Sequence, residues 1–357
     1  MTYTLSREPT LILDSAACKL LFSDPIQSES AAILLRSRLL SAARRLGLAE
    51  SRRENMALVA SEMASNLIKH AGGRGMLQIW EQPGGMLDVV SFDYGPGMGN
   101  PHLAQEDGYS TKGTLGKGLG SMQRLADDFG IFSQMAGAGE RWHGTVVWCR
   151  FRAHAGGAKR GAGEADFCQL GLFVRSLSND RYNGDHVYVD IRPERLRLLH
   201  LDGLGHGESA ELATARLDRY FTQADSLGHL LEIVDRHLRS NARGAVAVAC
   251  EIDAATRELR MLGVGDMAAH LCRNGQVQHY AFAPGVLGRE HKNPQEAGAV
   301  LVRGASLVST SDGIRRGWGE DAFPGLCNQH PQLMAYVIGN VMARMTDDQS
   351  VCVLKLN

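Results

Sequence analysis

The sequence lacks any apolar run that approaches the roughly 18 residues needed to span a membrane. It also lacks basic blocks, since the 38 Lys and Arg residues are balanced by 39 Asp and Glu residues and no run of Lys and Arg exceeds two. The formal net charge is only −1. This balance excludes a strongly basic surface of the kind that binds nucleic acid, so we expect neither a nucleic-acid partner nor a membrane partner.

Cysteine motifs are missing as well. The seven cysteines are scattered, odd in number and never spaced as CxxC, which argues against a disulfide framework and against a zinc knuckle. The N-terminal segment carries Arg7, Glu8 and Asp14 where a secretory signal peptide would be apolar. These absences predict a soluble, cytoplasmic protein with reduced thiols.

The chain length predicts two domains. At roughly 150 residues per domain, 357 residues allow two domains that each bury a core. Residues 153–165 are the best boundary, because nine of these thirteen residues are Ala or Gly, a composition typical of a flexible connection. We therefore expect a first domain at 1–152, a linker at 153–165 and a second domain at 166–357.

The first half shows two helical patterns followed by strand-like runs. The second helical pattern opens with Ser51 and Glu54, the spacing of a capping box, and stops at Gly72-Gly73. We expect helices at 29–46, 51–71 and 118–129 and strands at 76–81, 86–93 and 143–152. Two helices ahead of a sheet predict an α/β sandwich, with the helices on one face of a mixed sheet.

The second half is richer in short strands. We expect strands at 167–175, 185–191, 196–201, 245–253, 258–263, 267–272, 276–282, 306–310 and 350–356, and helices at 207–220, 226–239 and 331–345. Many strands with few long helices predict two packed sheets with helices outside them, so that the whole chain is an α+β protein.

The second expected helix carries a polar stripe. Glu62, Asn66 and His70 recur at every fourth position and therefore share one face, beside an apolar stripe that contains Met63 and Leu67. For an arbitrary helix, the ordinary interpretation of such a stripe is a solvated face. Two glycine-rich segments further along the chain favour a binding site instead.

The two glycine-rich segments suit a nucleotide. Asp93 follows a strand-like run and leads into a turn with Gly95 and Gly97, where a carboxylate can accept a hydrogen bond from an adenine amino group. Residues 113–120, GTLGKGLG, lead directly into a helix, and the exposed N–H groups of such a loop favour phosphate. Each segment alone is weak evidence, but their order along the chain is informative.

The order of these segments, completed by Gly144-Thr145 on a strand, resembles the Bergerat-fold ATPases of gyrase, the heat-shock chaperones, histidine kinases and MutL. The segments ASEMASNLIKHAGG and YSTKGTLGKGLGSMQRLADDFGI look most like the small serine kinases and anti-sigma factors of the RsbT and RsbW type. The resemblance covers residues 10–152.

This resemblance implies ATP and Mg²⁺ as cofactors of the first half. It implies that Asn66 coordinates the Mg²⁺ on the ATP phosphates, that Asp93 recognises adenine, and that Glu62 is the catalytic base for a protein hydroxyl. The other implied pocket residues are Gly95, Gly97, Gly116, Gly118, Gly120 and Thr145. Tyr94 departs from the relatives, which usually carry Asn there, and His70 is not expected to accept a phosphoryl group. A degenerate pocket that binds no nucleotide is the alternative.

Acidic residues in turns mark a second site. Asp185, Asp202 and Asp312 stand in the motifs GD, DGLGHG and SDGI next to strand-like runs, and Asp347-Asp348 precede the last strand. Carboxylates at strand ends suit Mg²⁺ or Mn²⁺, and several strand ends can converge on one site. Any one of these motifs alone is more often an ordinary turn.

These four motifs resemble the metal-dependent PPM phosphatases over residues 166–357, particularly the SpoIIE, RsbU and RsbX branch, and imply an αββα sandwich. The implied ligands of two ions, Mn²⁺ or Mg²⁺, are Asp185, Asp202, the Gly203 carbonyl, Asp312 and Asp347. Asp348 is the alternative to Asp347. We expect His206 to order its loop and Asp266 to form a turn without binding metal.

The two resemblances together imply a bifunctional bacterial partner-switching regulator. Its first half would phosphorylate, and its second half dephosphorylate, Ser or Thr residues of STAS-domain proteins, either anti-sigma antagonists or stressosome components. The alternative is an ATP-binding module that holds a STAS protein, a sigma factor or another downstream regulator and governs the fused phosphatase without kinase activity. A homodimer is left open.

Overall fold

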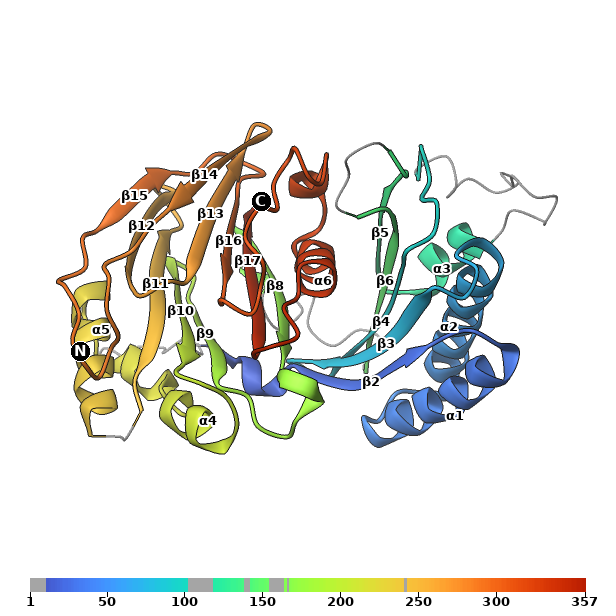
Figure 1. Cartoon of the computed structure of the whole chain (residues 1–357), viewed down its shortest axis with the longest axis horizontal. Coiled ribbons are helices and arrows are strands. Elements are labelled where there is room, and N and C mark those ends of the chain that lie inside the picture. The colour runs from blue at the N-terminus through green and yellow to red at the C-terminus, as the bar shows by residue number, and fades with distance from the viewer. Residues whose placement is uncertain (1–10, 102–117, 138–141, 154–163, 166, 241–242) are drawn as a thin grey trace, which may run out of the picture. The chain divides into compact units, whose positions relative to one another are not determined.

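The structure is a computed structural model of residues 1–357 and describes all of them except 1–10, 102–117, 138–141, 154–163, 166 and 241–242 (Figure 1). The chain forms two compact units: unit 1 consists of Met1–Ala16, Ala162–Arg316 and Ala343–Asn357, and unit 2 of Ala17–Gly161 and Gly317–Met342. Neither unit is continuous in sequence, because segment 317–342 of the predicted second domain belongs to unit 2. The predicted linker, 153–165, lies mostly outside the described residues.

Unit 2 is built on a five-stranded sheet in the order β2-β3-β4-β6-β5. The strands are β2 (Lys19–Pro25), β3 (Gly75–Gln82), β4 (Met86–Asp93), β5 (Asp128–Gln134) and β6 (Gly144–Arg152). Every neighbouring pair in it is antiparallel. The α+β fold is therefore as predicted, but the described strands of this sheet are antiparallel throughout and do not form the mixed sheet that was expected.

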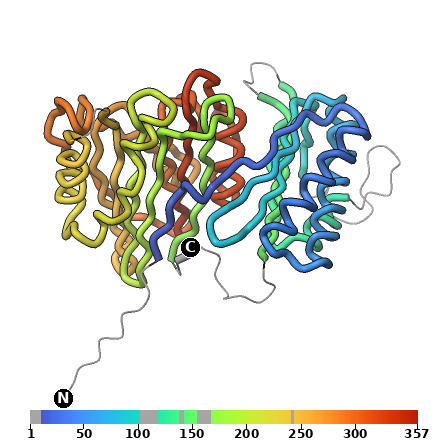
Figure 2. Tube along the Cα trace, turned by 90° about the horizontal axis from the view of Figure 1, so that it is seen from below, coloured from blue at the N-terminus to red at the C-terminus, as the bar shows by residue number. Residues whose placement is uncertain are grey.

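Helices α1 (Glu29–Arg45) and α2 (Glu50–His70) lie side by side on one face of this sheet (Figures 1 and 2). Their apolar residues meet those of the strands in one core that includes Leu39, Met63 and Val89. The predicted capping box was wrong, because the N-cap of α2 is Ala49, which has no capping side chain. The Ala49 carbonyl already accepts the N–H of Arg53, at 3.0 Å, so the helix begins before Ser51.

Helix α6 (Pro331–Val341) covers the opposite face of the same sheet, beside β5 and β6 (Figure 1). All of its residues are buried. Polar side chains anchor it: Gln78 Nε2 donates to Asn340 Oδ1 at 2.9 Å, and Gln82 Nε2 donates to Tyr336 Oη at 2.9 Å. Helices therefore lie on both faces of this sheet, whereas the sequence predicted them on one face only.

A buried ion pair completes the contact beneath α6. Asp88 accepts hydrogen bonds from Arg150 Nε at 2.7 Å and Nη2 at 2.8 Å, and from Tyr336 Oη at 2.8 Å. Because Asp88→Ala would leave the Arg150 charge buried and unpaired, we expect it to lower the free energy of unfolding by about 3–5 kcal/mol. Urea denaturation measures this change.

The exposed pair Arg38–Asp24, at 2.9 Å, provides the matched control. This pair is a single exposed contact in which water screens both charges, so we expect Asp24→Ala to lower the free energy of unfolding by less than about 1 kcal/mol. Equal losses in the two variants would contradict a role for burial at Asp88.

Unit 1 contains two six-stranded sheets, in the orders β1-β9-β10-β11-β12-β15 and β14-β13-β16-β17-β8-β7. The first sheet consists of β1 (Leu11–Asp14), β9 (Asp185–Ile191), β10 (Arg195–Gly203), β11 (Ala245–Asp253), β12 (Glu258–Val264) and β15 (Ala297–Val300). The second consists of β14 (Gln276–Tyr280), β13 (Ala268–Arg273), β16 (Ser306–Thr310), β17 (Gln349–Leu356), β8 (Cys168–Arg175) and β7 (Glu164–Ala165).

Helices α4 (Glu208–Thr214) and α5 (Leu227–Arg239) contribute to a core with the first of these sheets, in which Leu231, Leu199 and Ala247 are buried. The predicted helix 207–220 was too long, because α4 ends at Thr214 and a 3₁₀ turn follows at Asp218–Thr222. Within the described ranges, no helix is both long and apolar enough to cross a membrane.

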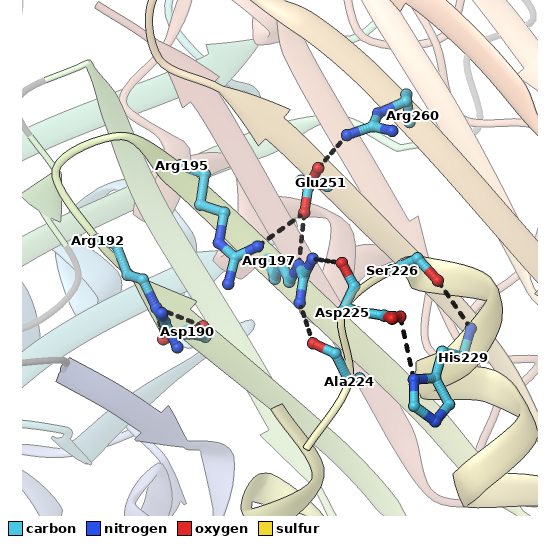
Figure 3. A network of polar contacts seen from close by, with 10 residues as sticks. All are labelled: Asp190, Arg192, Arg195, Arg197, Ala224, Asp225, Ser226, His229, Glu251 and Arg260. Carbon is cyan, nitrogen blue, oxygen red and sulfur yellow. Dashed lines mark hydrogen bonds and ion pairs between the residues drawn. The ribbon is translucent and has the colours of Figure 1, made fainter. Parts of the chain in front are cut away.

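A buried carboxylate ties α5 to this sheet (Figure 3). Glu251 accepts hydrogen bonds from Arg197 Nε at 2.5 Å and Arg195 Nη1 at 3.5 Å, and it also binds Arg260. Arg197 in turn donates to the carbonyls of residues 224–225, just before α5 (Figure 3). These partners satisfy a charge that would otherwise be costly to bury.

Candidate functional sites

The polar stripe of α2 faces the start of α3 (Gly118–Leu125). Glu62 is exposed and Asn66 is half-buried, whereas Met63 and Leu67 beside them are buried in the core. The Cβ position of Gly118 is 3.2 Å from Glu62 Oε2. A side chain at residue 118 would therefore crowd this carboxylate, and the N-terminus of α3 lies within reach of Glu62.

Asp93 lies at the end of β4 and is held by two backbone donors. Its Oδ1 accepts the N–H of Gly95 at 2.7 Å and the N–H of Thr145 at 3.2 Å. Burial, the largest effect, raises the pKa of Asp93, while these two hydrogen bonds and the charges of Arg74 and His143 lower it. The sequence-predicted adenine carboxylate and Thr145 are thus brought together on β4 and β6.

Ser133 on β5 connects the same elements, although no sequence motif marked it. Its hydroxyl lies 2.9 Å from Thr145 Oγ1, donates to the Gly144 carbonyl at 2.9 Å and accepts the Met98 N–H at 2.8 Å. It stands in an ordinary strand run, so only the register of β5 against β6 places it here.

The glycine turn after Asp93 has little room. Gly97 has a φ of +73°, and a Cβ on it would stand 2.0 Å from the Gln134 carbonyl oxygen, so this position requires glycine. Gly118 and Gly120 lie in the first turn of α3. Gly116 and the rest of the predicted phosphate loop up to residue 117 lie outside the described residues.

Three of the predicted metal ligands meet at the ends of strands in unit 1. Asp202 on β10 is the direct register partner of Asp185 on β9. The Asp312 N–H, just after β16, donates to Asp202 Oδ2 at 3.4 Å. Gly203 donates its N–H to the Gly184 carbonyl at 3.1 Å, which holds the DGLGHG turn against the GD turn.

Burial and nearby carboxylates raise the pKa values of Asp185, Asp202 and Asp312. Burial is the largest cause in each case: it raises the pKa of Asp185 to about 7, and it raises those of Asp202 and Asp312 as well. Asp347 adds negative charge near all three. A cluster of partly buried carboxylates of like charge is chemically suited to a hard divalent cation, which would relieve the repulsion.

The carboxylates do not yet form a closed cage. In the part of the chain that the structure describes, no three His, Cys, Asp or Glu side chains are arranged as a ready metal-binding group. The donor set therefore fits Mg²⁺ or Mn²⁺ in its chemistry, and binding an ion would require the carboxylates to draw together.

The two consecutive aspartates before β17 have different surroundings. Asp348 is buried, and its two carboxylate oxygens accept the N–H groups of Leu177 and Gly184, each at 2.7 Å. Asp347 is half-buried and influences the other carboxylates through its charge. This difference supports Asp347 as the ligand and assigns Asp348 to fixing the turn before β9, a role that the sequence did not reveal.

Two further residues lie near the acidic cluster. His206 is exposed, and its charge lowers the pKa of Asp348. Asp266 occupies a bend between β12 and β13, as predicted, but its charge raises the pKa of Asp312. Sequence reasoning set Asp266 aside as a turn residue and missed its proximity to Asp312.

Comparison with known proteins identifies both halves. Residues 27–151 match the family Histidine kinase-like ATPase domain, and residues 192–357 match the family Stage II sporulation protein E (SpoIIE). The chain is 34% identical over 110 residues to the serine/threonine-protein kinase RsbT of Bacillus subtilis (strain 168), which covers 30% of this chain and 81% of RsbT.

Two solved structures are also similar. RsbX in complex with magnesium is 17% identical, with 54% of this chain and 98% of RsbX covered and a TM-score of 0.47. A structure from the bacterial stressosome, described as a modular system adapted to control secondary messenger signaling, is 25% identical, with 53% and 99% covered and a TM-score of 0.48.

Proposed function

Because this chain belongs to the family of the serine/threonine-protein kinase RsbT and joins its ATPase domain to a SpoIIE-type serine/threonine phosphatase domain, we propose that it is a cytoplasmic bacterial partner-switching regulator. It phosphorylates and dephosphorylates Ser or Thr residues of STAS-domain proteins, which are anti-sigma antagonists or stressosome components. ATP and a divalent metal are its cofactors. The family matches confirm both resemblances predicted from the motifs.

The kinase assignment depends mainly on one observation, the Glu62 carboxylate beside the N-terminus of α3. Asn66, one helical turn away, would hold Mg²⁺ on the ATP phosphates, and Asp93 would accept the adenine amino group. The free N–H groups of the first turn of α3 would bind phosphate. Glu62 would then take the proton of the substrate hydroxyl as it attacks the γ-phosphate.

The phosphatase assignment depends on the converging carboxylates of unit 1. Asp185, Asp202 and the Gly203 carbonyl would hold one divalent ion, and Asp312 and Asp347 would hold the other. Two such ions supply an activated water and neutralise phosphoryl charge. The chain's own carboxylates fix where the ions stand, and His206 lies at the exposed edge, where a phosphoprotein would enter.

Transfer of radiolabel from γ-labelled ATP to a STAS-domain protein tests the kinase. We expect Glu62→Gln to slow the transfer by roughly 10²–10⁴-fold while ATP still binds, because only the base is lost. Glu54→Gln, two turns earlier on the exposed side of α2, is the matched control and should have little effect. If the wild type transfers no label but ATP changes STAS binding, the domain is the alternative binding module without kinase activity.

A further inference from the structure

A string of polar side chains crosses the interior between the two sheets of unit 1. His200 on β10, Ser309 on β16 and Ser350 on β17 are fully buried. His200 Nδ1 lies 2.9 Å from Ser309 Oγ, and His200 Nε2 lies 2.8 Å from Ser350 Oγ. Ser350 Oγ donates in turn to Asp185 Oδ2 at 2.7 Å. The string therefore ends on a carboxylate of the acidic cluster.

The direction of each hydrogen bond follows from this ending. Ser350 donates its single hydroxyl proton to Asp185 Oδ2. Ser350 Oγ must then accept a proton from His200 Nε2, and His200 Nδ1 accepts the proton of Ser309. This pattern requires the neutral imidazole with its proton on Nε2. Each polar atom in the string has a partner.

Packing alone does not explain the string. Inward positions of a sandwich are normally apolar, and the residues two positions away on the same strand faces, Leu198, Leu307 and Cys352, are buried apolar residues. Replacing both partners of a buried hydrogen bond by apolar groups of the same shape can be nearly neutral for stability, so folding alone does not require this string. Polar residues that depart from the expected apolar pattern are often functional.

We propose that His200 and Ser350 are positioning residues of the phosphatase metal site. By engaging Oδ2, they fix the orientation of the Asp185 carboxylate toward a divalent cation. Asp185 also accepts a hydrogen bond from the Ser311 side chain. Such outer partners orient a ligand and raise metal affinity. The inference rests on the proposed phosphatase function.

The test measures Mn²⁺ affinity of the full chain by calorimetry, without substrate. We expect Ser350→Ala and His200→Leu each to weaken Mn²⁺ binding by about 10–100-fold. His200→Gln, whose amide can replace the Nε2 donor, should recover part of the affinity. His270→Leu is the matched control, because His270 is also buried in unit 1 but packs against His279 on β14. The Mn²⁺ affinity of this variant should equal that of the wild type.

Thermal unfolding without metal identifies variants that fail to fold. If His200→Leu fails to fold, Ser350→Ala, which removes a single oxygen, still provides the test. Wild-type Mn²⁺ affinity in folded Ser350→Ala and His200→Gln would overturn the positioning role alone. Absence of Mn²⁺ binding by the wild type would instead overturn the proposed metal site, and the positioning role with it.

Discussion

Asp202→Ala is expected to slow hydrolysis of a phosphorylated STAS-domain protein by roughly a hundredfold or more. Asp202 is the register partner of Asp185 and the acceptor of the Asp312 N–H, at 3.4 Å. Its removal would therefore disturb both proposed ion positions at once. Release of inorganic phosphate at saturating Mn²⁺ measures the effect.

The control for this variant is Asp253→Asn. Asp253 ends β11 in the same sheet, but its carboxylate serves a turn, in which it accepts the N–H groups of Ala255 and Thr256. We expect nearly unchanged hydrolysis in Asp253→Asn. Wild-type turnover in folded Asp202→Ala at saturating Mn²⁺ would show that Asp202 does not hold the ion.

The elements of unit 1 could be predicted well because their signals are local. Strands β9, β11 and β16 occur at the predicted residues, 185–191, 245–253 and 306–310. Each is a short apolar run bounded by turn residues, and such runs need no knowledge of the rest of the chain. The turns at their ends carry the acidic motifs, so the candidate ligands were found together with the strands.

The position of α6 could not be predicted in the same way. Its residues Leu333, Tyr336 and Ile338 show that the helix is buried, but an apolar helix does not specify the surface against which it packs. Its partners Gln78 and Asp88 alternate with apolar residues along β3 and β4, which is also the pattern of a strand with one solvated face. Chain order places α6 in the second half, and the family match at 192–357 includes it, whereas its packing groups it with unit 2.

Residues that support the acidic cluster were missed for a related reason. His200 meets Ser350 from 150 positions away, and Asp348 meets Gly184 from 164 positions away. No spacing rule connects residues that far apart, because only the packing of the sheet that contains β9 and β10 against the sheet that contains β17 brings them together. Sequence motifs identify the residues that would contact a ligand. The residues that orient those ligand-binding side chains can be recognised only from the three-dimensional structure.

Asn66→Ala is expected to abolish phosphoryl transfer from ATP while phosphatase turnover remains near the wild-type value. Asn66 lies on α2 in unit 2, one turn from Glu62, and the proposed phosphatase ligands all lie in unit 1. Loss of the Mg²⁺ ligand should remove the charge neutralisation that phosphoryl transfer requires. Labelled ATP and a phosphorylated STAS-domain protein measure the two activities on one preparation.

Lys69→Ala, at an exposed position near the end of the same helix, is the control for helix perturbation and should retain both activities. The informative comparison is the ratio of the two activities. If Asn66→Ala loses kinase activity but keeps phosphatase activity, each unit carries its own complete site. If folded Asn66→Ala loses both activities to the same extent, nucleotide binding in unit 2 is required for hydrolysis in unit 1, and the two sites cannot be independent.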